Sequence, residues 1–144
     1  MKLFTIGFTK RTAEAFFTAL QAANVRRIVD VRINNTSQLA GFAKARDLEY
    51  FLRAVAGIDY IHLPAFAPTQ ELLDDYKKKK GAWESYERGF AALMNARGAD
   101  ATARDMLRDG DCLLCSEYAP EHCHRRLLAE RFSTLLDNVE VAHL

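Results

Sequence analysis

Residues 112–136 read CLLCSEYAPEHCHRRLLAERFSTLL, and this stretch decides the expected fold. An apolar segment at 112–115 predicts a strand, and a polar turn follows it. Pro120 is expected at the first position of the next helix, where its missing N–H costs nothing. Residues 121–136 then predict an α-helix, because apolar residues recur there at helical spacing. Its buried stripe consists of Leu127, Leu128, Phe132, Leu135 and Leu136.

The rest of the chain repeats this alternation of strand and helix. Strands are expected at 3–8, 27–33, 58–63 and 139–144, helices at 13–23, 46–56, 70–80, 83–97 and 101–108, and a loop at 34–41. Such alternation predicts an α/β protein: a three-layer, mostly parallel sheet of about five strands, with helices on both faces. The helix at 46–56 is expected to bury Leu48, Phe51, Leu52 and Val55. Without a linker or repeat, residues 1–144 are expected to form a single α/β domain.

Composition excludes several classes of protein. The 144 residues carry a net charge of +1, so no overall field indicates strong binding to a nucleic acid or a membrane. No apolar run is long enough to span a bilayer. Cys112, Cys115 and Cys123 are odd in number and clustered, which is a poor disulfide framework and fits a reducing compartment. We therefore expect a cytoplasmic protein of undetermined oligomeric state.

Polar residues stand where the expected strands end. The first strand leads to Gly7 and Thr9, the second carries Asp30 and Arg32, and the third ends near His62. Because parallel strands finish at one edge of a sheet and ligands bind there, these residues and Arg125 are the candidate substrate-binding set. Asp30 and Arg32 have an alternative interpretation as a structural ion pair, and His62 as an ordinary hydrogen-bonded residue.

A second set of residues is the candidate catalytic set. Cys115 ends the fourth predicted strand and Glu117 follows it. Cys123 and His124 lie one turn before Leu127 and Leu128, on the buried face of the final helix. Cys115, Glu117, Cys123 and His124 are therefore expected to meet at one rim. Cys112 should point to the opposite face of its strand and behave as a small buried hydrophobe.

The stretch Leu113–Arg125 resembles the signature of the uncharacterised family catalogued as domain of unknown function 488. The resemblance lies in a cysteine, a glutamate two residues on, and a Cys-His-Arg triplet at this spacing. Thr5-Ile6-Gly7, Val29-Asp30-Val31-Arg32 and Tyr60-Ile61-His62-Leu63-Pro64 also resemble that family's strands. One departure is Phe8-Thr9, where the family usually carries His-Ser. The resemblance implies the fold and the site positions and says little about the reaction.

Three functions are compatible with these residues. In the first, the protein is a cysteine-dependent transferase or hydrolase without a cofactor, acting on a small anionic, phosphate- or nucleotide-like substrate. Cys115 is then the nucleophile, Cys123 resolves or assists, Glu117 orients His124 or transfers protons, and Arg32 and Arg125 bind the anion. In the second, Cys115, Cys123 and His124, with Glu117, bind zinc or iron. In the third, Lys77–Lys80, Trp83, Arg125 and Arg126 bind a nucleic acid; otherwise the lysines form a solvated helix end.

Overall fold

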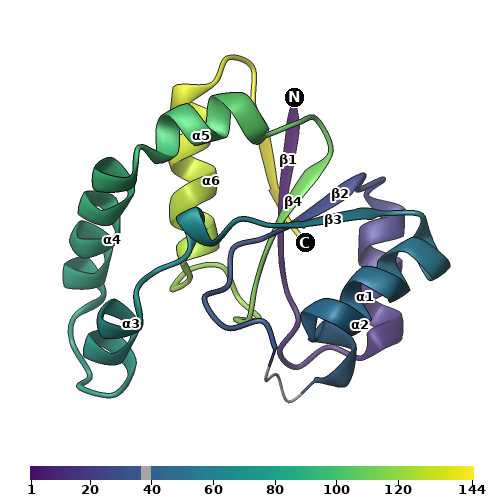
Figure 1. Ribbon diagram of the computed structural model, residues 1–144, viewed down its shortest axis with the longest axis horizontal. Helices are drawn as coiled ribbons and strands as arrows, with labels where there is room; N and C mark the ends of the chain where they lie inside the picture. The colour runs from purple at the N-terminus through teal and green to yellow at the C-terminus, as the bar shows by residue number, and fades with distance from the viewer. Residues whose placement is uncertain (37–39) are drawn as a thin grey trace.

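The computed structural model describes residues 1–36 and 40–144, and Figure 1 shows its elements. Residues 37–39 of the predicted 34–41 loop lie outside the described residues. The strands are β1 (Lys2–Gly7), β2 (Arg27–Asp30), β3 (Asp59–His62), β4 (Asp111–Cys115) and β5 (Glu140–His143). The helices are α1 (Ala13–Ala22), α2 (Ala45–Phe51), α3 (Gln70–Lys77), α4 (Trp83–Arg97), α5 (Ala99–Met106) and α6 (His124–Leu135). Short 3₁₀ turns lie at Gly41–Ala43 and Pro64–Phe66.

The five strands form one sheet in the order β3-β2-β4-β1-β5, and every neighbouring pair is parallel. All strands therefore end at the same edge. Gly7 pairs with Cys115, and Asp30 pairs with His62. This confirms the predicted α/β fold and makes the sheet wholly parallel. At the opposite edge, Arg27 and Asp111 form a buried ion pair at 2.7 Å.

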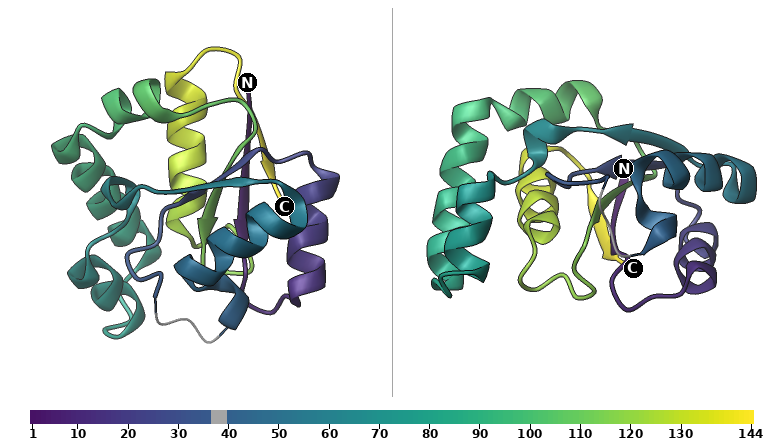
Figure 2. Two further views of the ribbon diagram at one scale, coloured as in Figure 1. Left: turned by 45° about the vertical axis from the view of Figure 1, so that its right-hand side comes forward. Right: turned by 60° about the horizontal axis from the view of Figure 1, so that its bottom comes forward.

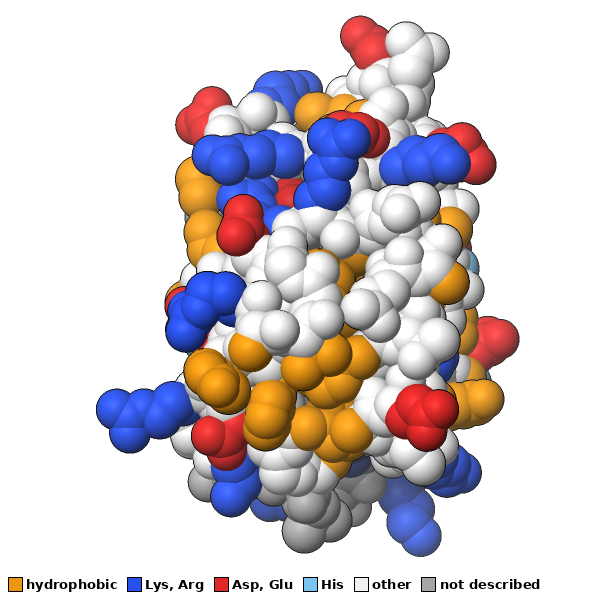
Figure 3. All heavy atoms as spheres, turned by 90° about the vertical axis from the view of Figure 1, so that its right-hand side faces the viewer, with side chains coloured by type: hydrophobic (Ala, Val, Ile, Leu, Met, Phe, Trp, Pro, Cys, Tyr) orange, Lys and Arg blue, Asp and Glu red, His pale blue; other side chains and the backbone are white. Residues whose placement is uncertain are grey.

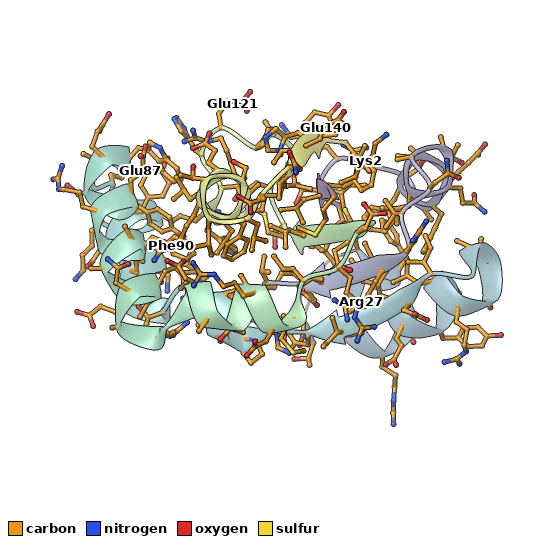
Figure 4. All side chains as sticks on the ribbon, turned by 90° about the horizontal axis from the view of Figure 1, so that it is seen from above. Lys2, Arg27, Glu87, Phe90, Glu121 and Glu140 are labelled. Atoms are coloured by element: carbon orange, nitrogen blue, oxygen red, sulfur yellow. A yellow bond between two sulfur atoms is a disulfide. The ribbon has the colours of Figure 1, made fainter. Side chains whose placement is uncertain are left out.

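Helices cover both faces of the sheet, as predicted (Figures 1 and 2). One core lies under α1 and α2 and includes Phe4, Ile6 and Cys112. The other lies under α5 and α6 and includes Leu3, Leu113 and Cys115. Successive strand residues alternate between these cores, because the side-chain period of a strand is two. Cys112 thus lies on the opposite face from Cys115, as predicted. In the view from above, Phe90 projects from α4 toward α6 (Figure 4).

Two predicted element boundaries differ from the structure, at the end of β2 and at the start of α6. β2 ends at Asp30 instead of continuing to residue 33, because the backbone N–H and guanidinium of Arg32 turn back to bind the Asp30 carboxylate. The last helix begins at His124, so Pro120 lies in the preceding loop and not at the first helical position. A turn with the Cys123 N–H donating to the Pro120 carbonyl at 3.2 Å precedes the helix.

The predicted helix at 46–56 also changes character. It is α-helical only to Phe51, and Leu52–Ala56 form a π-helical turn that ends at Gly57 with φ of 64°. Leu48 and Leu52 are buried as predicted, whereas Phe51 and Val55 are 36% and 55% exposed. With Phe17 and Phe42 they line a shallow apolar depression. Figure 3 shows apolar side chains gathered on this side of the molecule. Among the described residues, no helix combines the length and apolar composition needed to cross a bilayer.

Candidate active site

A cavity of about 280 Å³ opens beyond the carboxyl ends of β2 and β4, bounded on its other side by α3 and α4. All four residues of the predicted catalytic set line it, so the expected convergence of sulfur, imidazole and carboxylate groups is present. Of the predicted substrate-binding set, only Arg32 is among the described lining residues. The lining consists of Arg32, Ile33, Asn34, Pro68, Gln70, Leu73, Tyr76, Lys77, Trp83, Tyr86, Cys115, Ser116, Glu117, His122, Cys123 and His124.

Cys115 and Cys123 meet at the base of this cavity. Cys115 is the last residue of β4, and Cys123 occupies the extended cap position immediately before α6. The structure joins their sulfurs in a disulfide, with Cα atoms 7.6 Å apart. Both side chains are almost completely buried, yet both form part of the cavity wall. The cavity is therefore the route by which a solute reaches either sulfur.

The backbone carbonyl of Val31, the residue that follows β2, holds the His124 ring. Its Nε2 lies 2.7 Å from the Val31 carbonyl, which can only accept a hydrogen bond, so Nε2 carries the proton. Its Nδ1 then presents a lone pair and lies 3.9 Å from the Cys123 sulfur. Burial lowers the pKa of His124 to about 4, outweighing the Val31 carbonyl, which favours the protonated ring. At neutral pH the imidazole is uncharged, and Val31, not Glu117, orients it.

Arg125 lies directly behind Cys115 and is completely buried. Its Nη1 donates to the Cys115 sulfur at 3.3 Å and to the Glu117 carbonyl, its Nη2 donates to the Tyr118 carbonyl at 3.2 Å, and its Nε donates to the Thr5 hydroxyl at 3.3 Å. Burial lowers the pKa of Arg125 to about 10, so it remains a cation at neutral pH. These contacts fix the 116–118 loop and hold the positively charged guanidinium against the Cys115 sulfur. Arg125 is not among the described residues that line the cavity, so the structure does not present it to a substrate anion there.

Gly7 permits this loop to cross the end of β1. A Cβ at position 7 would overlap the backbone carbonyl oxygen of Glu117 and lie 2.8 Å from Arg125 Nη1. The Gly7→Ala variant must therefore displace the loop, and we expect it to lose about 1–3 kcal/mol of unfolding free energy. Urea unfolding measures the loss, with Gly41→Ala as a control, because a Cβ there meets nothing within 4 Å. Equal stability of the two variants would contradict this role of Gly7.

Glu117 lies at the mouth of the cavity and is paired with Lys77 of α3. Lys78 and Lys79 pair with Asp74 and Asp75 of their own helix at 3.6 and 3.1 Å. These ion pairs support the interpretation of the lysine run as a solvated helix end. They leave little free positive charge there for the phosphates of a nucleic acid.

Asp30 and Arg32 form the structural ion pair that was one of the two predicted alternatives. Arg32 Nε and Nη2 each donate to the Asp30 carboxylate at 2.8 Å, and Arg32 Nη1 donates to the Ala43 carbonyl at 2.7 Å. The Tyr60 hydroxyl donates to the same carboxylate at 2.6 Å. Burial alone would raise the pKa of Asp30, but the Arg32 and Tyr60 interactions outweigh it, so the pKa is lowered. Arg32 therefore lines the cavity with its positive charge already neutralised by the Asp30 carboxylate.

The remaining predicted substrate-binding residues also have internal partners. His62 Nε2 lies 2.9 Å from the Arg32 carbonyl, which fits the alternative interpretation of a hydrogen-bonded edge residue. The Thr9 hydroxyl donates to the Ser116 carbonyl, and Thr9 lines a separate shallow depression beside Tyr118. These contacts support the ends of the strands.

Sequence reasoning missed the aromatic wall of the cavity. Tyr76, Trp83, Tyr86 and His122 form one cluster, with the Trp83 ring centroid 4.9 Å from those of both Tyr86 and His122. Trp83 and Tyr86 lie in the predicted helix at 83–97, but Tyr76 and His122 come from other segments, whose placement depends on tertiary packing. The sequence did offer one indication of this wall, because His122 immediately precedes Cys123.

The chain was also compared with known proteins. No curated protein and no solved structure matches it significantly. A family model, described as domain of unknown function DUF488, matches residues 12–132. The match spans α1 through most of α6 and includes all four residues of the catalytic set. The chain therefore belongs to the DUF488 family.

Proposed function

We propose that the protein is a cysteine-dependent enzyme that carries out thiol–disulfide exchange on a small molecule bound in the cavity. The observation that carries this proposal is the position of Cys115: its sulfur contacts the Arg125 guanidinium on one side and the Cys123 sulfur on the other. A neighbouring cation favours the thiolate, which is the reactive form of cysteine. The Cys123 thiol, which is within bonding distance, is suited to resolve a mixed disulfide formed on Cys115.

The exchange proceeds in two steps that balance in atoms and electrons. The Cys115 thiolate attacks one sulfur of a disulfide R–S–S–R, the substrate S–S bond breaks, and RS⁻ leaves. The Cys123 thiolate then attacks the Cys115 sulfur, releases the second RS⁻ and leaves the Cys115–Cys123 disulfide. The substrate gains two electrons and the cysteine pair loses two. Because the Cys123 sulfur is within bonding distance of the Cys115 sulfur, it can resolve the adduct without water, which favours exchange over the hydrolase alternative.

The charges of the wall bear on the substrate. Among the described residues that line the cavity, the arginine and lysine side chains are those of Arg32 and Lys77, and each is paired with a carboxylate. A strongly anionic substrate would have to compete with those carboxylates. The aromatic cluster instead offers ring faces and edges to a planar, uncharged group. This arrangement favours a neutral aromatic or apolar substrate over the phosphate-like one that the sequence suggested.

A neutral aromatic disulfide, 4,4′-dithiodipyridine, tests the mechanism on the reduced protein. Wild type is expected to release two thiopyridones per molecule and to end as the internal disulfide, with no adduct in the intact mass. Cys123→Ser should release one thiopyridone and retain a mixed disulfide, because no second thiol is left to resolve it. Cys112→Ser is the matched control and should behave as wild type, since Cys112 is buried on the other face. Retention of the adduct by folded wild type would overturn the proposal.

A further inference from the structure

The two cysteines and His124 also form a set of potential metal ligands. Cys115 Sγ, Cys123 Sγ and His124 Nδ1 all lie within 4.8 Å of one another. Zinc bonds of about 2.0–2.3 Å in tetrahedral geometry hold ligand atoms roughly 3.3–3.8 Å apart. The distance between His124 Nδ1 and Cys123 Sγ is 3.9 Å, so a small shift of the two side chains brings them to that separation. Thiolate sulfur and imidazole nitrogen are the donors that zinc prefers.

The imidazole already has the tautomer that a metal ligand needs. The Val31 carbonyl accepts a hydrogen bond from Nε2–H and fixes the ring, so the lone pair is on Nδ1, on the side of the Cys123 sulfur. Metal-binding histidines in proteins are typically oriented in this way, by a carbonyl or carboxylate that accepts the hydrogen bond from the other nitrogen. The hydrogen bond requires no metal, and the ring is therefore preorganised for one.

The backbone lets two consecutive residues reach one point. Cys123 is extended, with φ of −135° and ψ of 141°, whereas His124 is the first residue of α6. This change of backbone conformation turns the neighbouring side chains toward the same place, which relieves the strain expected of adjacent ligands. The Cα atoms of Cys115 and Cys123 are 7.6 Å apart. This separation leaves room for an ion between the two sulfurs once the disulfide is reduced.

We infer that the reduced protein binds a zinc ion through Cys115, Cys123 and His124, with the fourth coordination position facing the cavity. Three protein ligands and one open position are the pattern of a catalytic zinc site, whereas structural sites use four protein ligands. Arg125 Nη1 donates to the Cys115 sulfur and offsets part of the negative charge of two thiolates. Oxidation to the disulfide removes both sulfur ligands, so the oxidised protein is not expected to bind the ion.

Cobalt(II) titration of the reduced, metal-free protein under anaerobic conditions tests the site. Wild type should develop thiolate-to-cobalt charge-transfer absorption and the intense visible bands of tetrahedral cobalt, and added zinc should abolish both. Cys115→Ser, Cys123→Ser and His124→Asn should each lose the wild-type spectrum. His122→Asn, which changes another histidine of the same cavity, should retain it. Circular dichroism confirms that each variant is folded.

Oxidised wild type supplies a measurement that needs no substitution, and it should give no cobalt spectrum. Binding by the oxidised protein, or an unchanged spectrum after loss of any one of the three ligands, would overturn the inference. Its failure is distinguishable from failure of the proposed function, because thiopyridone release is measured on metal-free protein with chelator present. Exchange without cobalt binding would leave the exchange mechanism standing and remove the zinc site.

Discussion

Replacing Arg125 with Met is expected to lower the free energy of unfolding by about 2–4 kcal/mol and to slow the attack of Cys115 on 4,4′-dithiodipyridine. Methionine fills much of the space but donates no hydrogen bond. The partly buried carbonyls of Glu117 and Tyr118 then lose their donors, and an acceptor left without a donor costs up to about 1–3 kcal/mol, the larger value applying to full burial. The Cys115 sulfur loses the adjacent cation, so less of it is thiolate at neutral pH.

Two further substitutions separate these effects. Arg125→Lys retains the charge without the planar fork, and it should recover part of the reaction rate while remaining less stable than wild type. Arg126→Met is the control on the next residue, whose partners Glu87, Glu130 and the Glu121 carbonyl are at the surface; it should change stability by no more than about 1 kcal/mol. Urea unfolding and thiopyridone release measure both quantities. If Arg125→Met and Arg126→Met had the same effects, Arg125 would not have the role described.

Replacing Asp30 with Asn should be at least as damaging to stability, by about 3–5 kcal/mol at neutral pH. The substitution leaves the buried Arg32 cation without its counter-ion, and an uncompensated buried charge carries a cost of that size. The Tyr60 hydroxyl also loses its strongest acceptor. Asp59→Asn is the control, because Asp59 is exposed at the opposite end of β3 and should change stability by about 0.5 kcal/mol or less.

The cost of Asp30→Asn should depend on pH in a defined direction. The pKa of Asp30 is lower in the folded protein than its ordinary value of 3.8, so its stabilising contribution is complete above that value and is lost as the pH falls through the folded-state pKa. The stability gap between wild type and variant should therefore be full at pH 7 and shrink in acid. A gap that stays constant into strong acid would show that Asp30 contributes by shape and not by charge.

The positions of the four catalytic candidates were predictable from the sequence for two physical reasons. Parallel strands end at one edge, which places Cys115 and Glu117 there, and helical periodicity places His124 on the buried face of α6, with Cys123 at the cap just before it. Both predictions hold although the start of the last helix was predicted too early. Pro120 suggested an earlier start, but the turn that the Cys123 N–H closes onto the Pro120 carbonyl places the boundary at His124.

What the sequence left open depends on contacts between distant segments. Arg125 is next to a residue of the buried face, yet only the folded loop shows that its guanidinium is used internally. Arg32 was placed on a strand, whereas its bond to Asp30 takes it into the loop beyond. Tyr76 reaches the cavity through the packing of α3 on α4, which no local pattern encodes.

In the proposed exchange, Cys115 receives the substrate and Cys123 resolves the product. Peptide mapping of Cys123→Ser after reaction with 4,4′-dithiodipyridine shows which cysteine carries the mixed disulfide. The adduct is expected on Cys115, and Cys115→Ser is expected to react much more slowly at Cys123. An adduct on Cys112, or equal reactivity of Cys115 and Cys123 when each stands alone, would contradict it.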